Sequence, residues 1–173
     1  MTTSKTKKKS SVRPAKTKSV RLPSRLSDLI DLALKDLTAV ENLPKRYRVD
    51  MDDNFVSSPD EFGVCEVCFA GAVMARRCGA DGDEGKTRKL LDFGKNSNKF
   101  WALDYVRSGS IGNAVRVLHT GTDDSLYVKE GKVKASFGNE YDSRESVSVY
   151  SFSPSLFKSQ MFGIAARLRA IGL

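Results

Sequence analysis

The sequence predicts a mainly α-helical domain with a minor β element (α+β), preceded by a disordered basic arm. Several stretches repeat apolar residues at spacings of three and four, which is typical of helices packed on a core. Only short stretches alternate between apolar and polar residues as strands do. The first 22 residues contain almost nothing that a core can bury. With 173 residues, 40% of them apolar, the chain is long enough for one domain and a tail. We expect a basic arm, residues 1–22, and a body, residues 23–173.

The basic arm contains eight of the 29 basic residues of the chain and none of its 21 acidic residues. The net charge of +8 therefore belongs to the arm, and the body is neutral overall. Its few apolar residues follow no period, so the arm cannot offset the entropy lost on ordering. Such a polycation suits phosphate backbones, and any binding is expected to tolerate all sequences because no aromatic residue is present to stack on bases. A tail that only aids solubility is the alternative. The basic residues are Lys5, Lys7, Lys8, Lys9, Arg13, Lys16, Lys18 and Arg21.

The body opens with an amphipathic helix. Ser24 or Ser27 can cap its start, and Asn42 and Pro44 end it. Alternation over residues 47–52 then indicates a short half-buried strand, followed by a polar loop. The apolar stripe of the helix consists of Leu26, Leu29, Ile30, Ala33, Leu37 and Val40.

Residues 64–78 predict a helix of a different kind, which is apolar on nearly every face. A helix that is apolar all round is buried all round. Small residues around Gly71 would allow neighbouring helices to approach closely, and Gly79 would end the helix. We expect this segment to be the central buried helix of the domain.

The second half of the body alternates between helical and polar stretches. Its expected elements are a polar connection (80–97), a helix (98–107) capped by Ser97, a helix (111–121), a hairpin around Glu130-Gly131, a strand through Val147, Val149 and Phe152, and a last helix begun by Ser153 and Pro154.

Three patterns in the sequence resemble catalytic or ion-binding motifs without their context. Residues 80–87 have the letters of a loosened phosphate-binding loop, but they follow a helix and place acidic side chains where phosphates would sit. The same acidic residues do not keep the register of a calcium loop. Residues 92–94 read Asp-Phe-Gly without the other motifs of a kinase. We therefore expect a non-catalytic protein with no catalytic residues.

The three cysteines and the single histidine form a possible zinc set, which we weigh and reject. On one continuous helix Cys65 and Cys78 lie about 20 Å apart, too far to share an ion with Cys68. Buried thiols behave as small apolar side chains, and His119 suits the negative end of a helix. A redox pair needs a strand before its helix, and only a loop is expected before Cys65. We expect reduced core thiols, no metal and no cofactor.

Three separated boxes of the chain occur in a recognisable order. They are residues 29–37 with 47–51, the run Val-Cys-Glu-Val-Cys-Phe-Ala-Gly-Ala-Val-Met-Ala at 64–75, and residues 101–109. Together they resemble a family of small accessory proteins of tailed bacteriophages, over roughly residues 26–118. The resemblance implies the cytoplasm of an infected bacterial host as the setting. It implies no activity and no site residue.

These features predict a non-catalytic phage accessory protein. We expect it to bind nucleic acid or a nucleoprotein assembly, such as the ribosome or polymerase, through the basic arm. The alternative is an inhibitor or adaptor of a host enzyme or defence protein, which would act through a protein–protein interface of the neutral body. No apolar run approaches the roughly 20 residues of a membrane span, so no membrane partner is expected.

Overall fold

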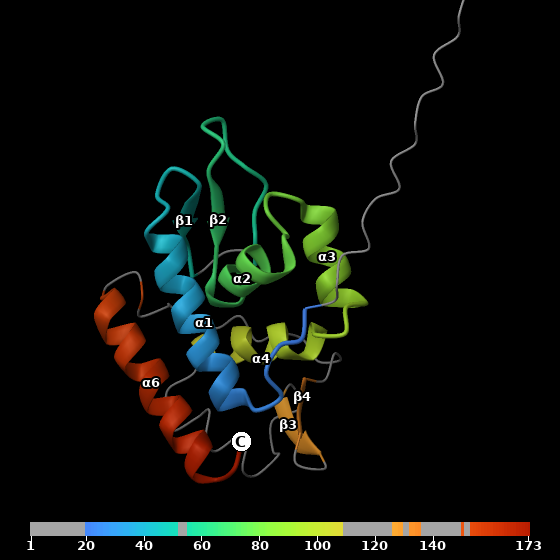
Figure 1. Cartoon of the computed structure of the whole chain (residues 1–173), viewed down its shortest axis with the longest axis vertical. Coiled ribbons are helices and arrows are strands. Elements are labelled where there is room, and N and C mark those ends of the chain that lie inside the picture. The colour runs from blue at the N-terminus through green and yellow to red at the C-terminus, as the bar shows by residue number, and fades with distance from the viewer. Residues whose placement is uncertain (1–19, 52–54, 109–125, 130–131, 136–149, 151–152) are drawn as a thin grey trace, which may run out of the picture.

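The computed structural model describes residues 20–51, 55–108, 126–129, 132–135, 150 and 153–173. Helices dominate these residues, and two small two-stranded sheets accompany them (Figure 1). The mainly α-helical class with a minor β element is thus confirmed. The helix expected at 111–121, with His119, and the strand through Val147, Val149 and Phe152 lie outside the described residues.

Helix α1 (Leu26–Glu41) has the expected apolar stripe buried, but neither predicted serine caps it. Its N-cap residue is Arg25, which makes no side-chain capping bond. Ser27 lies inside the first turn and is fully buried. Its hydroxyl donates to the Leu173 carbonyl oxygen at 2.6 Å. The serine therefore joins the start of α1 to the segment after the last helix, a long-range contact that a local capping signal cannot reveal.

The prediction of a central helix over residues 64–78 is wrong for its first residues. β2 (Cys65–Val67) is a strand that pairs in parallel with β1 (Tyr47–Val49), which confirms the strand expected there. Helix α2 (Phe69–Val73) starts only after Cys68 and continues as a π-helical turn, η1 (Met74–Cys78). A short apolar run fits a buried strand and a buried helix equally well, so the sequence alone does not distinguish them.

The rest of the central prediction is confirmed. All residues from Phe69 to Ala75 are buried, and Gly79 ends the segment in the left-handed conformation. At Gly71 a Cβ atom would lie 1.3 Å from the carbonyl oxygen of Phe55. The small residue is needed for a close approach as expected, but the neighbour is the backbone of a loop rather than another helix.

Residues 80–97 are not a simple polar connection, because they contain helix α3 (Glu84–Asp92). The Asp83 carboxylate caps this helix by accepting from the Lys86 amide at 2.9 Å. Helix α4 (Ser97–Ser108) follows, within a residue of its expected bounds. Thr87 is the one buried residue of α3, so the helix has no apolar stripe from which its period can be read.

The last elements match the sequence prediction. β3 (Leu126–Lys129) and β4 (Lys132–Ala135) pair as an antiparallel hairpin around residues 130–131. Helix α6 (Pro154–Ala170) begins with Pro154, and the Ser153 hydroxyl accepts from the Leu156 amide.

The core lies where α1, α2, α4 and α6 meet. α1 packs against α6 along its length and also contacts α2 and α4 (Figure 1). The rings of Phe69 and Phe157 meet edge to face, with centroids 5.5 Å apart. Within the described part of the chain no helix is both long and apolar enough to cross a membrane.

Candidate nucleic-acid interface

The structure describes one of the eight predicted arm residues, Arg21, and the other seven lie outside the described residues. Arg21 is exposed. The next residue, Leu22, is only 2% exposed and belongs to the core. The structural body therefore begins at the end of the segment that we named the basic arm, and Leu22 fixes the point where the two join.

The arm joins the body beside the turn between α3 and α4. The side-chain amide of Asn96 donates to the Val20 carbonyl oxygen at 3.0 Å. The ammonium of Lys99 donates to the Leu22 carbonyl oxygen at 2.7 Å. Burial, and secondly the positive charge of Arg21, lower the pKa of Lys99 below its usual value. The blue start of the described chain runs along this turn in Figure 1.

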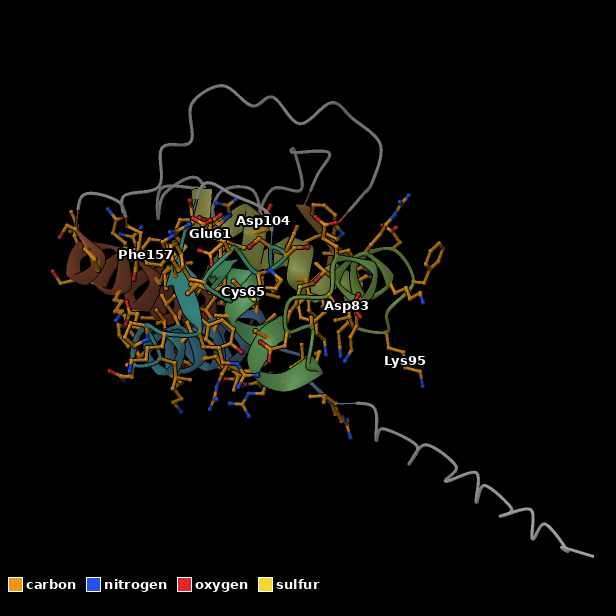
Figure 2. All side chains as sticks on the ribbon, turned by 90° about the horizontal axis from the view of Figure 1, so that it is seen from above. Glu61, Cys65, Asp83, Lys95, Asp104 and Phe157 are labelled. Carbon is orange, nitrogen blue, oxygen red and sulfur yellow. The ribbon has the colours of Figure 1, made fainter. Side chains whose placement is uncertain are left out.

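The body carries excess positive charge at this point although it is neutral as a whole. Residues 84–99, which we name the basic corner, contain five basic side chains and two acidic ones. Arg88 pairs with Asp92 at 3.4 Å, while Lys89 and Lys95 are exposed. The Lys95 side chain extends away from the body in Figure 2. The positive charge of the arm thus continues onto folded surface, a feature that the total charge of the body conceals.

An exposed aromatic side chain stands within the basic corner. Phe93, the residue that ends α3, is 87% exposed. The next residue, Gly94, approaches the helix so closely that a Cβ atom there would lie 2.4 Å from the Leu90 carbonyl oxygen. The sequence pattern alone linked Phe93 only to a chance kinase-like motif. Its exposure comes from the tight turn after α3, which we had not predicted.

Residues 80–87, the loosened phosphate-loop pattern, are engaged in internal contacts. The hydroxyl of Tyr47 donates to Asp81 at 2.5 Å, and Arg46 pairs with the same carboxylate. Lys86 donates to the carbonyl oxygen of Gly79. The segment does open α3, but the Asp83 carboxylate already accepts from the Lys86 amide in its first turn. The amide and the ammonium of Lys86, two donors that a phosphate would need, are thus engaged within the protein.

All three cysteines are free thiols: Cys65 and Cys68 are buried, and Cys78 is partly buried. Cys68 is fully buried, and burial raises the pKa of its thiol to about 11. Burial also raises the pKa of Cys65 and of Cys78. Cys65 lies on β2 and Cys78 at the end of η1, so the expected single helix through all three cysteines is wrong. Still, no three His, Cys, Asp or Glu side chains among the described residues are grouped to hold a metal ion.

A separate groove of about 530 Å³ lies between the end of α1, β1 and the loop before β2. Glu41 lines it and accepts from the Tyr150 hydroxyl at 2.5 Å and from the Lys158 ammonium. Burial and the hydrogen bond to Glu41 raise the pKa of Tyr150. Phe62, at the rim, is 80% exposed. The lining of the groove therefore combines the polar contacts of Glu41 with the exposed ring of Phe62.

Comparisons with known proteins give no relative: no protein-family model, no curated protein and no solved structure matches this chain.

Proposed function

We propose that this protein is a non-catalytic nucleic-acid-binding protein that uses its basic arm together with the basic corner. The observation that supports this most directly is the join between them. Asn96 and Lys99, both in the basic corner, hold the backbone of residues 20 and 22. A polycationic segment joined to the body beside a positive surface presents one continuous field to a phosphate backbone.

The expected binding is electrostatic and strongly dependent on salt. Each phosphate that a lysine or arginine neutralises releases condensed counterions, which favours association at low salt. The logarithm of the affinity falls with the logarithm of the salt concentration by roughly 0.9 for each duplex phosphate contacted, or about 0.7 for a single strand. The eight basic residues of the arm are enough to dominate this slope.

The biological setting that we propose follows from the three boxes that resemble phage accessory proteins. In the cytoplasm of an infected bacterium, the partner would be host or phage nucleic acid, free or within an assembly such as the ribosome or polymerase. No catalytic step is part of this proposal.

The test neutralises the arm in the intact chain. Changing the seven basic residues from Lys5 to Lys18 to Gln leaves Arg21 and the buried Leu22 in place. We expect weaker oligonucleotide binding and a salt slope lower by several units, because most phosphate contacts are lost. Fluorescence anisotropy titrations across a range of KCl concentrations measure both. As a control, Lys35→Gln with Lys45→Gln removes exposed charges from the body outside the basic corner. Unchanged affinity and slope in the arm variant would contradict the proposal.

The second candidate is an inhibitor or adaptor that binds a host protein through the neutral body. The groove beneath the exposed Phe62 favours it, since exposed aromatic side chains are enriched at protein interfaces. A pull-down from host lysate, with and without nuclease, separates the two candidates. A protein that is retained at stoichiometric yield after nuclease supports the second, whereas loss of all retained material supports the first.

A further inference from the structure

We propose that Phe93 is a base-stacking residue, and that the basic corner therefore selects unpaired nucleic-acid strands over duplex. This inference rests on the proposed nucleic-acid binding and specifies its substrate class. The arm itself contains no aromatic residue, so a stacking contact has to come from the body.

Phe93 has no packing role that would explain a large apolar side chain at its position. At 87% exposed, it is the most exposed of the large apolar side chains in the described part of the chain. Most of the surface of this phenylalanine is therefore open to solvent. Stacking of a base on such a ring contributes roughly 1–3 kcal/mol and tolerates all bases, since every base has a π-face.

The backbone that carries the ring is held in place. The Phe93 amide donates to the Lys89 carbonyl oxygen at 3.1 Å, and the Ser97 amide donates to the Gly94 carbonyl oxygen at 3.0 Å. The close approach of Gly94 to Leu90 leaves no room for a side chain at that position. A ring on a fixed backbone, with only two side-chain torsions, loses little entropy when a base stacks on it.

The charges around Phe93 match a phosphate backbone. Lys89 lies one helical turn before it and Lys95 two residues after it, both exposed. The arm joins the body at Asn96, three residues after Phe93. A strand drawn to the arm by its phosphates therefore passes the ring, with lysines on both sides to neutralise the neighbouring phosphates.

Phe62 is a second exposed phenylalanine, but its charged neighbours differ from those of Phe93. It is 80% exposed, but Asp60 and Glu61 precede it directly in the chain. Asp60 accepts from the amides of Phe62 and Val64, which holds its carboxylate against the backbone of this loop. Like charges would repel phosphates from this loop. Figure 2 shows Glu61, the neighbour of Phe62 in the chain, well apart from Lys95 of the basic corner.

Stacking on an exposed ring requires a base whose face is free. In a duplex the base faces are covered by their neighbours, and exposing one costs unstacking energy. The arm attracts single strands and duplexes alike, whereas Phe93 adds affinity only for unpaired bases. The intact protein should therefore bind an oligothymidylate more tightly than a duplex when the salt concentration is high enough to weaken the arm.

The experiment compares Phe93→Ala, Phe93→Trp and Phe62→Ala in the full chain. The probes are a labelled oligothymidylate of about 15 nucleotides, within the site sizes of single-strand binders, and a duplex of the same length. We expect Phe93→Ala to weaken oligothymidylate binding by roughly 5- to 150-fold, the range that one stacked base gives. Duplex binding and the salt slope should stay unchanged, because no charge is removed. Phe93→Trp should retain the affinity for the single strand, and Phe62→Ala should have no effect.

Each outcome decides between the inference and the function on which it rests. Equal oligothymidylate binding by Phe93→Ala and the wild type, with loss of binding in the arm variant, would overturn the stacking role and leave the proposed function standing. Equal effects of Phe93→Ala on strand and duplex would also overturn it. Failure of the wild type to bind either probe would reject the proposed function itself. Because Phe93 is exposed, the variant is expected to unfold at the same temperature as the wild type, which circular dichroism checks.

Discussion

The central segment and the basic corner are neighbours in the sequence and opposites in their physical character. The central segment, residues 65–78, is buried over most of its length, with every residue from Phe69 to Ala75 enclosed by the rest of the body. The basic corner, residues 84–99, exposes most of its side chains, and α3 buries only Thr87. The central segment therefore maintains the fold, whereas the basic corner exposes the side chains of the proposed interface.

A glycine illustrates the contrast in each region. Gly71 is fixed against the Phe55 carbonyl oxygen in the interior, and the Phe55 ring in turn packs edge to face on Trp101. Gly94 makes a similarly close approach at the surface, where it turns the chain and leaves Phe93 exposed. Gly71 allows close packing in the interior, and Gly94 allows the tight turn beside the exposed Phe93 side chain.

The largest effect on stability is expected from Gly71→Ala. The added Cβ would lie 1.3 Å from a backbone oxygen, so the loop around Phe55 must move away from α2. We expect a loss of about 4 kcal/mol or more in the free energy of unfolding, measured by urea denaturation. Gly85→Ala in α3 is the matched control, because its Cβ would meet only the Asp83 carboxylate, at 3.3 Å. Equal stability of the two variants would contradict the contrast between the central segment and the basic corner.

Arg77→Ala is expected to have the next largest effect. Arg77 donates to both oxygens of the Asp36 carboxylate, at 2.8 and 2.9 Å, and the Asp36 side chain is only 5% exposed. Removing the guanidinium leaves a buried charge without this partner, which typically costs about 3 kcal/mol or more.

The control for Arg77→Ala lies in the basic corner. Arg88, which pairs with Asp92, is 84% exposed, and Arg88→Ala should cost less than about 1 kcal/mol of stability. It should instead weaken oligonucleotide binding, because it removes a charge from the proposed interface. Denaturation and anisotropy titrations on both variants test this division. Equal losses of stability would argue against it.

A smaller effect concerns the pH dependence of stability and Cys68. Burial raises the pKa of this thiol from 9.0 to about 11 in the folded protein. Between about pH 9 and 11 the folded state therefore keeps a proton that the unfolded state loses. The contribution of the Cys68 thiol to the free energy of unfolding falls as the pH rises through this range. A shift of this size corresponds to about 2 kcal/mol at the upper end.

Cys68→Ser isolates this contribution, because its hydroxyl does not titrate in this range. Unfolding free energies of the variant and the wild type are compared between pH 8 and 10.5. Titration of the other groups changes the stability of both proteins alike. The difference in their free energies of unfolding should therefore shift in favour of the serine variant as the pH rises. A constant difference would show that the thiol titrates normally.

Local signals in the sequence were sufficient for part of the fold. The stripe of α1, the hairpin β3–β4 and the start of α6 at Ser153 and Pro154 all follow from spacing, turn residues and capping. β2 was missed because a run of three residues has no readable period, and its strand character comes from pairing with β1. α3 was missed because it buries a single residue.

The candidate site was predictable only where charge is concentrated along the chain. The basic arm stands out in the sequence because it has no acidic residue. The basic corner does not, because acidic residues elsewhere in the body balance it. Its link to the arm depends on two hydrogen bonds to Asn96 and Lys99 across more than seventy residues of sequence. Phe93 becomes a candidate only once its exposure is known.

The central claim is that the basic corner binds nucleic acid while the central segment maintains the fold. Photo-crosslinking of an oligonucleotide to the intact protein tests this claim most directly. An oligonucleotide that contains 5-bromodeoxyuridine is bound at moderate salt and irradiated, and the crosslinked tryptic peptides are identified by mass spectrometry. We predict crosslinks in the peptide of residues 90–95, which contains Phe93. Crosslinks confined to the peptide of residues 49–76, which contains Phe62 and most of the central segment, would contradict the account.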